Sequence, residues 1–539
     1  MLSYRKLAMR VLGRPLHTGG IDSPRPASQR AAAFILTAVM LTTLAAPAFA
    51  GTWSIENGDI TVKAGETGND VTQNNVTTKN DTDTIITNSD KDTASSHTVT
   101  IETNDKNDKV EVTLDNVNIK ADSGSALTSK GDVTLTLKGD NSLTGGNGGS
   151  GISSSGSLTI SGGENNSLTA QGGSGSGIFS SGGVTISGGT VNATGGTGGT
   201  GENSNGGSGI YIYSSSGSLT VSGGTVTANG GSGGGNGGDG ISSTNTTISG
   251  GSTVTANGGN GGSLVGGDGI RSGGGLTVSD GTVTAKGGNG DSKDGYGGDG
   301  IRSGGVVTIS GNTVNAAGGY GGKVGGYGIC SFDRVASSGG TVEAAGGNGS
   351  TGGGSGIYSS VIDLSGSLEL TAKAGSPNGK ALSQNGSELV LDTIKDKLGP
   401  GAKVTATDAD GKVIDQVSTP RPVEPEESSS SSDGGSSAPS APASPLPGLT
   451  VTDKDGQRIS YTSTQSGNTL TVCVGRLTAS FRISLAALRQ LRAEGIETIA
   501  FQTVLCSTTL SVDELLAMGG EDAEAVLTHR FTDSSLTVG

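Results

Sequence analysis

The sequence predicts an all-β protein whose main part is a right-handed parallel β-helix. The chain of 539 residues contains 101 glycines and only 3% aromatic residues, so large apolar side chains are too few for a thick core. A Gly-Ile pair recurs every 26 to 32 residues, which indicates a repeat architecture. Within each repeat, apolar residues and threonine alternate with a period of two, as in strands. A thin core that is repeated coil upon coil fits all three observations.

The N-terminal segment 1–50 is predicted to be a secretory signal peptide. Six basic residues precede or flank an apolar run from 31 to 46, and the sequence Ala48-Phe49-Ala50 is typical of a cleavage site. No later stretch is apolar enough to span a membrane, so we expect no membrane span after cleavage and a secreted, extracellular or cell-surface protein. An uncleaved membrane anchor is the alternative.

Residues 51–417 are assigned to the β-helix, with an N-terminal cap. Each repeat starts at a Gly-Ile pair, continues through a run such as "LTVSGG" (219–224) and a second run such as "TVTA" (225–228), and ends in a long glycine loop. We therefore expect three short strands per coil. Glycine in the Ser-Gly-Gly and Asp-Gly turns is predicted to supply positive φ angles.

Two further segments follow the repeats. Residues 418–448 are rich in Pro and Ser and are predicted to be an extended linker. Residues 449–539 are predicted to form a small α+β domain of unknown role, with helices that begin after Ser484 and Ser511. Cys473 and Cys506 share this domain and could form a disulfide after export, whereas Cys330 is left without a partner.

The charge of the chain excludes one class of partner. Removing residues 1–50 takes six basic residues and one acid from totals of 34 and 49, which leaves a net charge near −20. Nucleic-acid binding needs clustered cations, so no nucleic-acid partner is expected.

Parts of the repeat region are similar to a known family. The segments "VEVTLDNVNIKADSGSAL" (110–127), "GDVTLTLKGDNSLTG" (131–145) and the "GGDGIRS" coils resemble the calcium-binding, pectate-lyase-like β-helical carbohydrate-binding domains of anaerobic plant-fibre-degrading bacteria. The resemblance covers roughly residues 95–385. It implies a secreted β-helix, expected to be a monomer, that binds a polysaccharide such as a plant cell-wall glycan without cleaving it.

The resemblance also implies a place for Ca²⁺, because acids near the Gly-Ile turns hold calcium in that family. Here the candidates are Asp239, Asp268 and Asp299, each in "GGDGI" on consecutive coils about 4.8 Å apart. This chain departs from the family pattern after Gly-Ile, where it has Arg271 and Arg302. In the alternative interpretation each aspartate bonds its own turn and these arginines neutralise Asp268 and Asp299.

The residue after each Gly-Ile is predicted to point outward and to form a column along the β-helix. This column contains several side chains suited to sugars, because aromatic rings stack on sugar rings and arginines donate to hydroxyl or carboxylate groups. The candidate carbohydrate-binding residues are Phe179, Tyr211, Tyr213, Arg271, Arg302 and Tyr358. Tyr296, Tyr320 and Tyr327 in nearby glycine loops are candidates for the rim. Alternatively, the loops cover the column and bury the aromatic rings.

Two other functions are left open by the sequence. A surface adhesin or scaffold would bind a protein partner instead of a polysaccharide. A polysaccharide lyase would use Arg271 or Arg302 to abstract a proton, although no nucleophile–His–acid set can be assembled from the repeats. A non-catalytic role is therefore expected.

Overall fold

The computed structural model describes residues 50–103, 108–420 and, from 449 to 538, all but 453–457, 460, 467, 475–478, 504–506, 520–522 and 530–533. The predicted signal peptide apart from Ala50, the predicted linker apart from 418–420, and Cys506 lie outside these residues. The described residues belong to two compact units. No helix among them has the length and apolar character needed to cross a bilayer.

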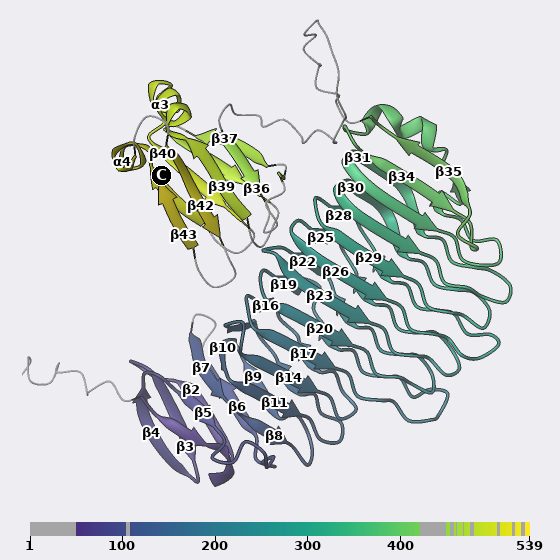
Figure 1. The fold of residues 1–539 in the computed structure, drawn as a ribbon. Helices are drawn as coiled ribbons and strands as arrows, with labels where there is room; N and C mark the ends of the chain where they lie inside the picture. The colour runs from purple at the N-terminus through teal and green to yellow at the C-terminus, as the bar shows by residue number, and fades with distance from the viewer. Residues whose placement is uncertain are drawn as a thin grey trace, which may run out of the picture. The chain divides into compact units, whose positions relative to one another are not determined.

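The first unit is the predicted parallel β-helix, with about 13 turns (Figure 1). Its strands pair in parallel with the equivalent strands of the coils before and after, so each coil contributes three strands to three faces. The long strands β30 (Ile329–Ala345) and β31 (Ile357–Lys373) each run along all three faces of one coil. The expectation of three strands per repeat is therefore confirmed.

Face 1 contains the Gly-Ile strands and the start of β30 and β31. Its other strands are β2 (Ile60–Ala64), β6 (Val99–Glu102), β9 (Leu127–Lys130), β12 (Ile152–Ser154), β15 (Ile178–Ser180), β18 (Ile210–Ile212), β21 (Ile241–Ser243), β24 (Ile270–Ser272), β27 (Ile301–Ser303) and β32 (Leu382–Gln384).

Face 2 follows across a short turn and includes the middle of β30 and β31. Its other strands are β1 (Thr52–Ser54), β5 (Ile85–Thr87), β7 (Lys109–Asp115), β10 (Asp132–Lys138), β13 (Leu158–Gly162), β16 (Val184–Ile186), β19 (Ser218–Val221), β22 (Asn245–Ile248), β25 (Leu276–Val278) and β28 (Val307–Ile309).

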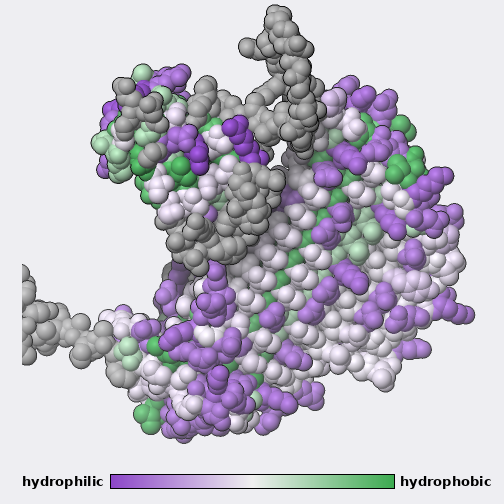
Figure 2. Space-filling view, viewed as in Figure 1, coloured by the Kyte–Doolittle hydropathy of each residue, from purple (hydrophilic) through white to green (hydrophobic). Residues whose placement is uncertain are grey.

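Face 3 completes the coil and faces the viewer in Figure 1. Figure 2 shows it as rows of pale and purple residues with narrow green rows between them, in agreement with the alternation along each strand. Besides the ends of β30 and β31, its strands are β8 (Asn118–Lys120), β11 (Asp140–Thr144), β14 (Ser167–Gln171), β17 (Thr190–Thr194), β20 (Thr225–Asn229), β23 (Ser252–Asn257), β26 (Gly281–Lys286), β29 (Thr313–Ala317) and β34 (Lys403–Thr407).

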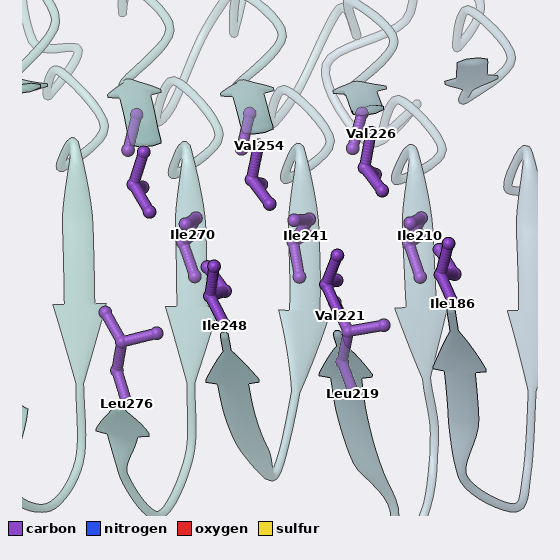
Figure 3. Close-up of a cluster of buried hydrophobic side chains, with 14 of the residues drawn as sticks. Ile186, Ile210, Leu219, Val221, Val226, Ile241, Ile248, Val254, Ile270 and Leu276 are labelled. Atoms are coloured by element: carbon purple, nitrogen blue, oxygen red, sulfur yellow. The ribbon is translucent and has the colours of Figure 1, made fainter. Parts of the chain in front are cut away.

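Inward side chains stack on their equivalents one coil away and form the core (Figure 3). Ile210, Ile241 and Ile270 are in register on face 1, and Val226 and Val254 are in register on face 3. All five are completely buried. Because equivalent positions on neighbouring strands are only about 4.8 Å apart, medium-sized side chains exclude water along the whole axis.

Antiparallel strands cover both ends of this core. At the N-terminal end, β2 pairs with β3 (Asn69–Gln73), which pairs with β4 (Val76–Asp81), and the short 3₁₀ helix η1 (Ile55–Asn57) lies next to β1 in sequence. At the C-terminal end, β34 pairs with β35 (Val413–Ser418) and β32 with β33 (Ser387–Glu388), and the 3₁₀ helix η2 covers Leu391–Lys397.

The glycines of the long loops have a role that the sequence did not predict. In the turn between β19 and β20, Gly224 has a φ of +76°, as expected for Ser-Gly-Gly. In the loops, the backbones of successive coils contact each other directly, because Gly259 N–H donates to Gly238 O of the preceding coil at 2.8 Å. Within the loop that contains Gly259, Gly267 N–H donates to Gly259 O, also at 2.8 Å. A Cβ atom on Gly267 would lie 1.9 Å from Gly238 O, so a side chain is excluded by the neighbouring backbone.

The second unit is the predicted α+β domain. One sheet has the order β36 (Leu449–Thr452), β39 (Ala479–Ser484), β42 (Glu524–His529), β43 (Ser534–Val538), and the other has β37 (Thr462–Ser466), β38 (Thr469–Cys473), β40 (Thr498–Gln502), β41 (Ser507–Ser511). Helices α3 (Leu485–Ala493) and α4 (Val512–Met518) each connect one sheet to the other. Both begin at the expected serines, because Ser484 accepts from Ala487 N–H and Ser511 from Glu514 N–H.

Candidate functional site

The predicted outward column exists on face 1. The strand register places Phe179 beside Tyr211, Arg271 beside Arg302, and Cys330 beside Tyr358 on successive coils. The column follows from the sequence pattern, because the preceding isoleucine and the following residue both point inward. The column is not uniform, however, and its members belong to two separate groups.

The first group is an aromatic cluster of Phe179, Tyr211 and Tyr213. The ring centroids of Phe179 and Tyr211 are 5.8 Å apart, and those of Tyr211 and Tyr213 are 6.0 Å apart. Tyr213 is 67% exposed, while the other two are partly buried against their neighbours. The glycine loops therefore leave at least one of these aromatic side chains accessible.

The second group surrounds a hollow of about 390 Å³ between face 1 and the glycine loops. Arg271 and Arg302 come from face 1, while Tyr296 and Tyr327 come from the loops. The remaining lining residues are Val265, Asp268, Gly297, Asp299, Val324, Gly325 and Gly326. An adjoining hollow of about 380 Å³ shares Val265 and Arg271 and extends to Asn205, so the two form a groove along the helix axis. We call it the arginine groove.

The loop residues of the arginine groove are positioned by the stacking of the loops. Val265, Tyr296 and Val324 form parallel bridges to one another on successive coils. Each of them directly precedes a Gly-Gly-x-Gly-Ile sequence. The sequence interpretation had Tyr296 and Tyr327 only as rim candidates and missed Val265 and Val324, which this position before the motif would have identified. Tyr320 does not line either hollow and is 48% exposed.

Tyr358 contributes indirectly. Its ring stacks on that of Tyr327, with centroids 4.9 Å apart and an angle of 19° between the planes. Tyr358 does not line the groove itself. Because its ring stacks on that of Tyr327, it holds Tyr327 in place from the next coil. The guanidinium carbon of Arg302 lies 5.0 Å from the ring centroid of Phe332. This cation–π contact holds the Arg302 side chain in place in a similar way.

The three aspartates form a ladder beneath the arginine groove. Asp268 N–H donates to Asp239 Oδ1 at 2.8 Å, Asp299 N–H donates to Asp268 Oδ1 at 2.8 Å, and the N–H of Tyr327, which replaces aspartate on the next coil, donates to Asp299 Oδ1 at 2.7 Å. The expectation that each aspartate bonds its own turn was wrong. The carboxylate instead continues the backbone hydrogen bonding from one coil to the next.

The second carboxylate oxygen of each aspartate forms an ion pair with an arginine. Arg271 Nε lies 2.9 Å from Asp268 Oδ2 and 3.2 Å from Asp239 Oδ2, and Arg302 Nη1 lies 3.1 Å from Asp299 Oδ2. The alternative in which these arginines neutralise the acids is therefore confirmed. Arg271 uses only Nε for these contacts, and within the described residues its two terminal amino groups make no hydrogen bond.

Burial raises the pKa of two aspartates in this ladder. It raises the pKa of Asp239 to about 6 and that of Asp299 to about 7, and in both cases the negative charge of Asp268 adds to the shift. Burial lowers the pKa of Arg271 and Arg302, but the neighbouring carboxylates outweigh it and both pKa values lie above the ordinary arginine value. Both guanidinium groups therefore stay positively charged.

The arrangement of the aspartates fits ion pairing better than calcium binding. Their oxygens already accept from backbone N–H groups or contact arginine, and in the described part of the chain no three His, Cys, Asp or Glu side chains gather in a way that could hold a metal ion. Calcium binding by Asp239, Asp268 and Asp299 stays a prediction. Cys330 is 1% exposed in the same column, and burial raises the pKa of its thiol to about 12, so it stays protonated.

Comparison of the chain with protein-family models, curated proteins and solved structures found no match.

Proposed function

We propose that the β-helix binds polysaccharide along the arginine groove without cleaving it, and that the protein does so outside the cell after export. The observation that carries the proposal is that two tyrosines and two arginines line one hollow. Tyrosine rings provide faces for sugar rings, and the free amino groups of Arg271 provide donors for sugar oxygens. The resemblance of the repeats to carbohydrate-binding β-helices supports the same class of ligand.

The shape of the groove suits a polymer better than a small molecule. Arg271 and Arg302 occupy equivalent positions on two successive coils, and Val265, Tyr296 and Val324 do so on three, so an extended chain contacts side chains from several coils in turn. The two hollows share Val265 and Arg271 and are continuous over several coils. An extended ligand can therefore add contacts unit by unit.

The protonation of the arginines supports binding over lyase chemistry. A base that abstracts a proton must be neutral at the moment of transfer, whereas the carboxylates of Asp239, Asp268 and Asp299 keep Arg271 and Arg302 positively charged. An assay for unsaturated sugar products tests the lyase alternative directly, and we expect no such product.

A scaffold that binds a protein partner is the second candidate. It is favoured by the exposure of Tyr213 and Phe332, which lie outside the arginine groove and are available to a flat protein surface. Binding of the full chain to a glycan array separates the two functions, because a protein-binding scaffold gives no glycan signal.

The test of the proposal is polysaccharide retention by groove variants. We expect Tyr296→Ala together with Tyr327→Ala to weaken binding of the full chain about tenfold or more, which corresponds to the loss of aromatic contacts. Tyr320→Ala is the matched control, because Tyr320 also lies in a glycine loop but lines neither hollow. Equal retention by the double variant and the control would contradict the placement of the binding site.

A further inference from the structure

The carboxylate of Asp81 is completely buried at the N-terminal end of the β-helix. Its Oδ1 accepts from Gly51 N–H at 2.8 Å, and its Oδ2 accepts from Trp53 Nε1–H at 2.8 Å. The N–H of Asp83 also donates to Oδ1, at 3.3 Å. Asp81 therefore ties the first described residues of the chain to the end of β4.

Among the residues that the structure describes, this carboxylate has no positively charged partner. Within the described residues, no Lys, Arg or His nitrogen lies within ion-pair distance of Asp81, and all of its donors are neutral. A fully buried carboxylate is rarely found without a counter-charge, because removing a charge from water costs several kcal/mol. Such a site therefore points to a cation that the described side chains do not supply.

The predicted cleavage site supplies this cation at the required atom. The signal-peptide pattern ends at Ala50, so the mature chain is expected to begin with Gly51. Ala50 is exposed and Gly51 is buried, so the boundary between them coincides with the edge of the folded unit. Gly51 O accepts from Ile85 N–H at 2.9 Å, which holds Gly51 in the ladder between β1 and β5.

We propose that cleavage between Ala50 and Gly51 completes the N-terminal end of the β-helix by creating a buried ion pair. A signal-peptide-cleaving protease adds water across the peptide bond: the hydroxyl goes to the carbonyl carbon of Ala50, the bond to Gly51 N breaks, and the remaining hydrogen of the water goes to that nitrogen. The new carboxyl group of Ala50 then loses its proton to water, and the amino group of Gly51 takes one up and becomes an α-ammonium group. The ammonium then occupies the position from which Gly51 N–H already contacts Asp81 Oδ1. This inference depends on the predicted signal peptide and is independent of polysaccharide binding.

The first test combines N-terminal sequencing with a mutant cycle. Sequencing of the exported protein is expected to give Gly51 as the first residue. Two forms of the chain, one starting at Gly51 and one starting at Ala50, are then compared with Asp81 intact and with Asp81→Asn. We expect the Gly51 form to melt higher by about 2 °C or more, and Asp81→Asn to remove that difference. A first residue other than Gly51, or a difference that persists in Asp81→Asn, would overturn the proposal.

A second readout does not require an Asp81 variant to fold. Trp53 is the single tryptophan of the chain and donates to the same carboxylate, so its fluorescence reports on this site. The ordinary pKa of an α-amino group is about 7.7–8.0, and Asp81 is expected to raise it, so the ion pair is intact below pH 8 and is lost as the pH rises above the raised value. We expect one step in Trp53 emission between neutral pH and about pH 10 for the Gly51 form, and no step after α-acetylation. Identical titrations of the Gly51 form before and after α-acetylation would contradict the ion pair.

Discussion

Glycine has two distinct roles in this chain, and single positions separate them. Gly224 adopts a positive φ that other residues rarely tolerate, whereas Gly267 has an ordinary φ and is required because a neighbouring carbonyl occupies the space of a Cβ atom. The composition alone shows how much glycine there is. It does not show which of the two roles a given glycine has.

Alanine substitutions can measure the second role. We expect Gly267→Ala to lower the free energy of unfolding by about 2–3 kcal/mol, because its Cβ would lie 1.9 Å from Gly238 O and the stacked loops would have to separate. Gly273→Ala is the control, since its Cβ would meet no atom closer than 3.9 Å and its φ is not positive. Chemical denaturation of both variants provides the comparison, and equal stability losses would contradict the close contact of the loops.

The aspartate ladder predicts that stability depends on pH. The ordinary pKa of aspartate is 3.8, and burial raises that of Asp299 to about 7. Between these values the folded chain binds more protons than the unfolded chain, so the free energy of unfolding falls as the pH rises from 4 to 7. The expected fall is on the order of 3 kcal/mol, at about 1.4 kcal/mol per pKa unit.

The Asp299→Asn variant isolates this effect. Its side-chain oxygen can still accept from Tyr327 N–H, while the titratable charge is removed. We expect the melting temperature of the variant to vary less between pH 4 and 7 than that of the unmodified chain. An unchanged pH profile in the variant would show that the dependence has another source.

At the scale of strands and loops, the sequence predicted the regular parts well. The strands β19 and β20 follow directly from the apolar–Thr alternation in "LTVSGGTVTA", because inward residues must recur every second position. The outward column was predictable for the same reason. The arginine groove was not, because it depends on where the glycine loops stack relative to face 1, and no periodicity of a single coil contains that information.

The separation of the column into two groups gives a prediction at this scale. Phe179, Tyr211 and Tyr213 lie outside the arginine groove, so Tyr211→Ala with Tyr213→Ala is expected to reduce polysaccharide retention less than the Tyr296→Ala, Tyr327→Ala pair. Retention on an immobilised polysaccharide measures both. A larger loss for the Tyr211, Tyr213 pair would place the main contact on the aromatic cluster.

At the scale of the molecule, the β-helix is a one-dimensional stack in which each coil contacts the coils next to it. Stability is therefore expected to be distributed over the coils, with the antiparallel strands at the two ends protecting the core from water. This organisation was predictable from the recurrence of Gly-Ile. The hydrogen bond from Gly51 N–H to Asp81 was not predictable, because it joins two residues of the N-terminal cap that the repeat pattern does not describe.

Removal of one complete coil tests this organisation. Deleting residues 241–269 removes β21, β22, β23 and one glycine loop and joins Gly240 to Ile270, whose neighbours keep the same inward pattern. We expect this variant to keep its strand content by circular dichroism. Deleting residues 241–255 instead removes about half a coil and breaks the register, and we expect that variant to unfold. Equal behaviour of the two deletions would contradict the stacked organisation.

The most direct test of polysaccharide binding in the arginine groove is the dependence of affinity on ligand length. Isothermal titration of the full chain with oligosaccharides of increasing length, prepared from a polysaccharide that it retains, gives the dissociation constant for each length. If the groove binds the sugar chain along successive coils, affinity rises with length until the groove is filled and then levels off, and the Tyr296→Ala, Tyr327→Ala pair reduces it. Affinity that is independent of length, or absence of binding to every polysaccharide tested, would contradict this function.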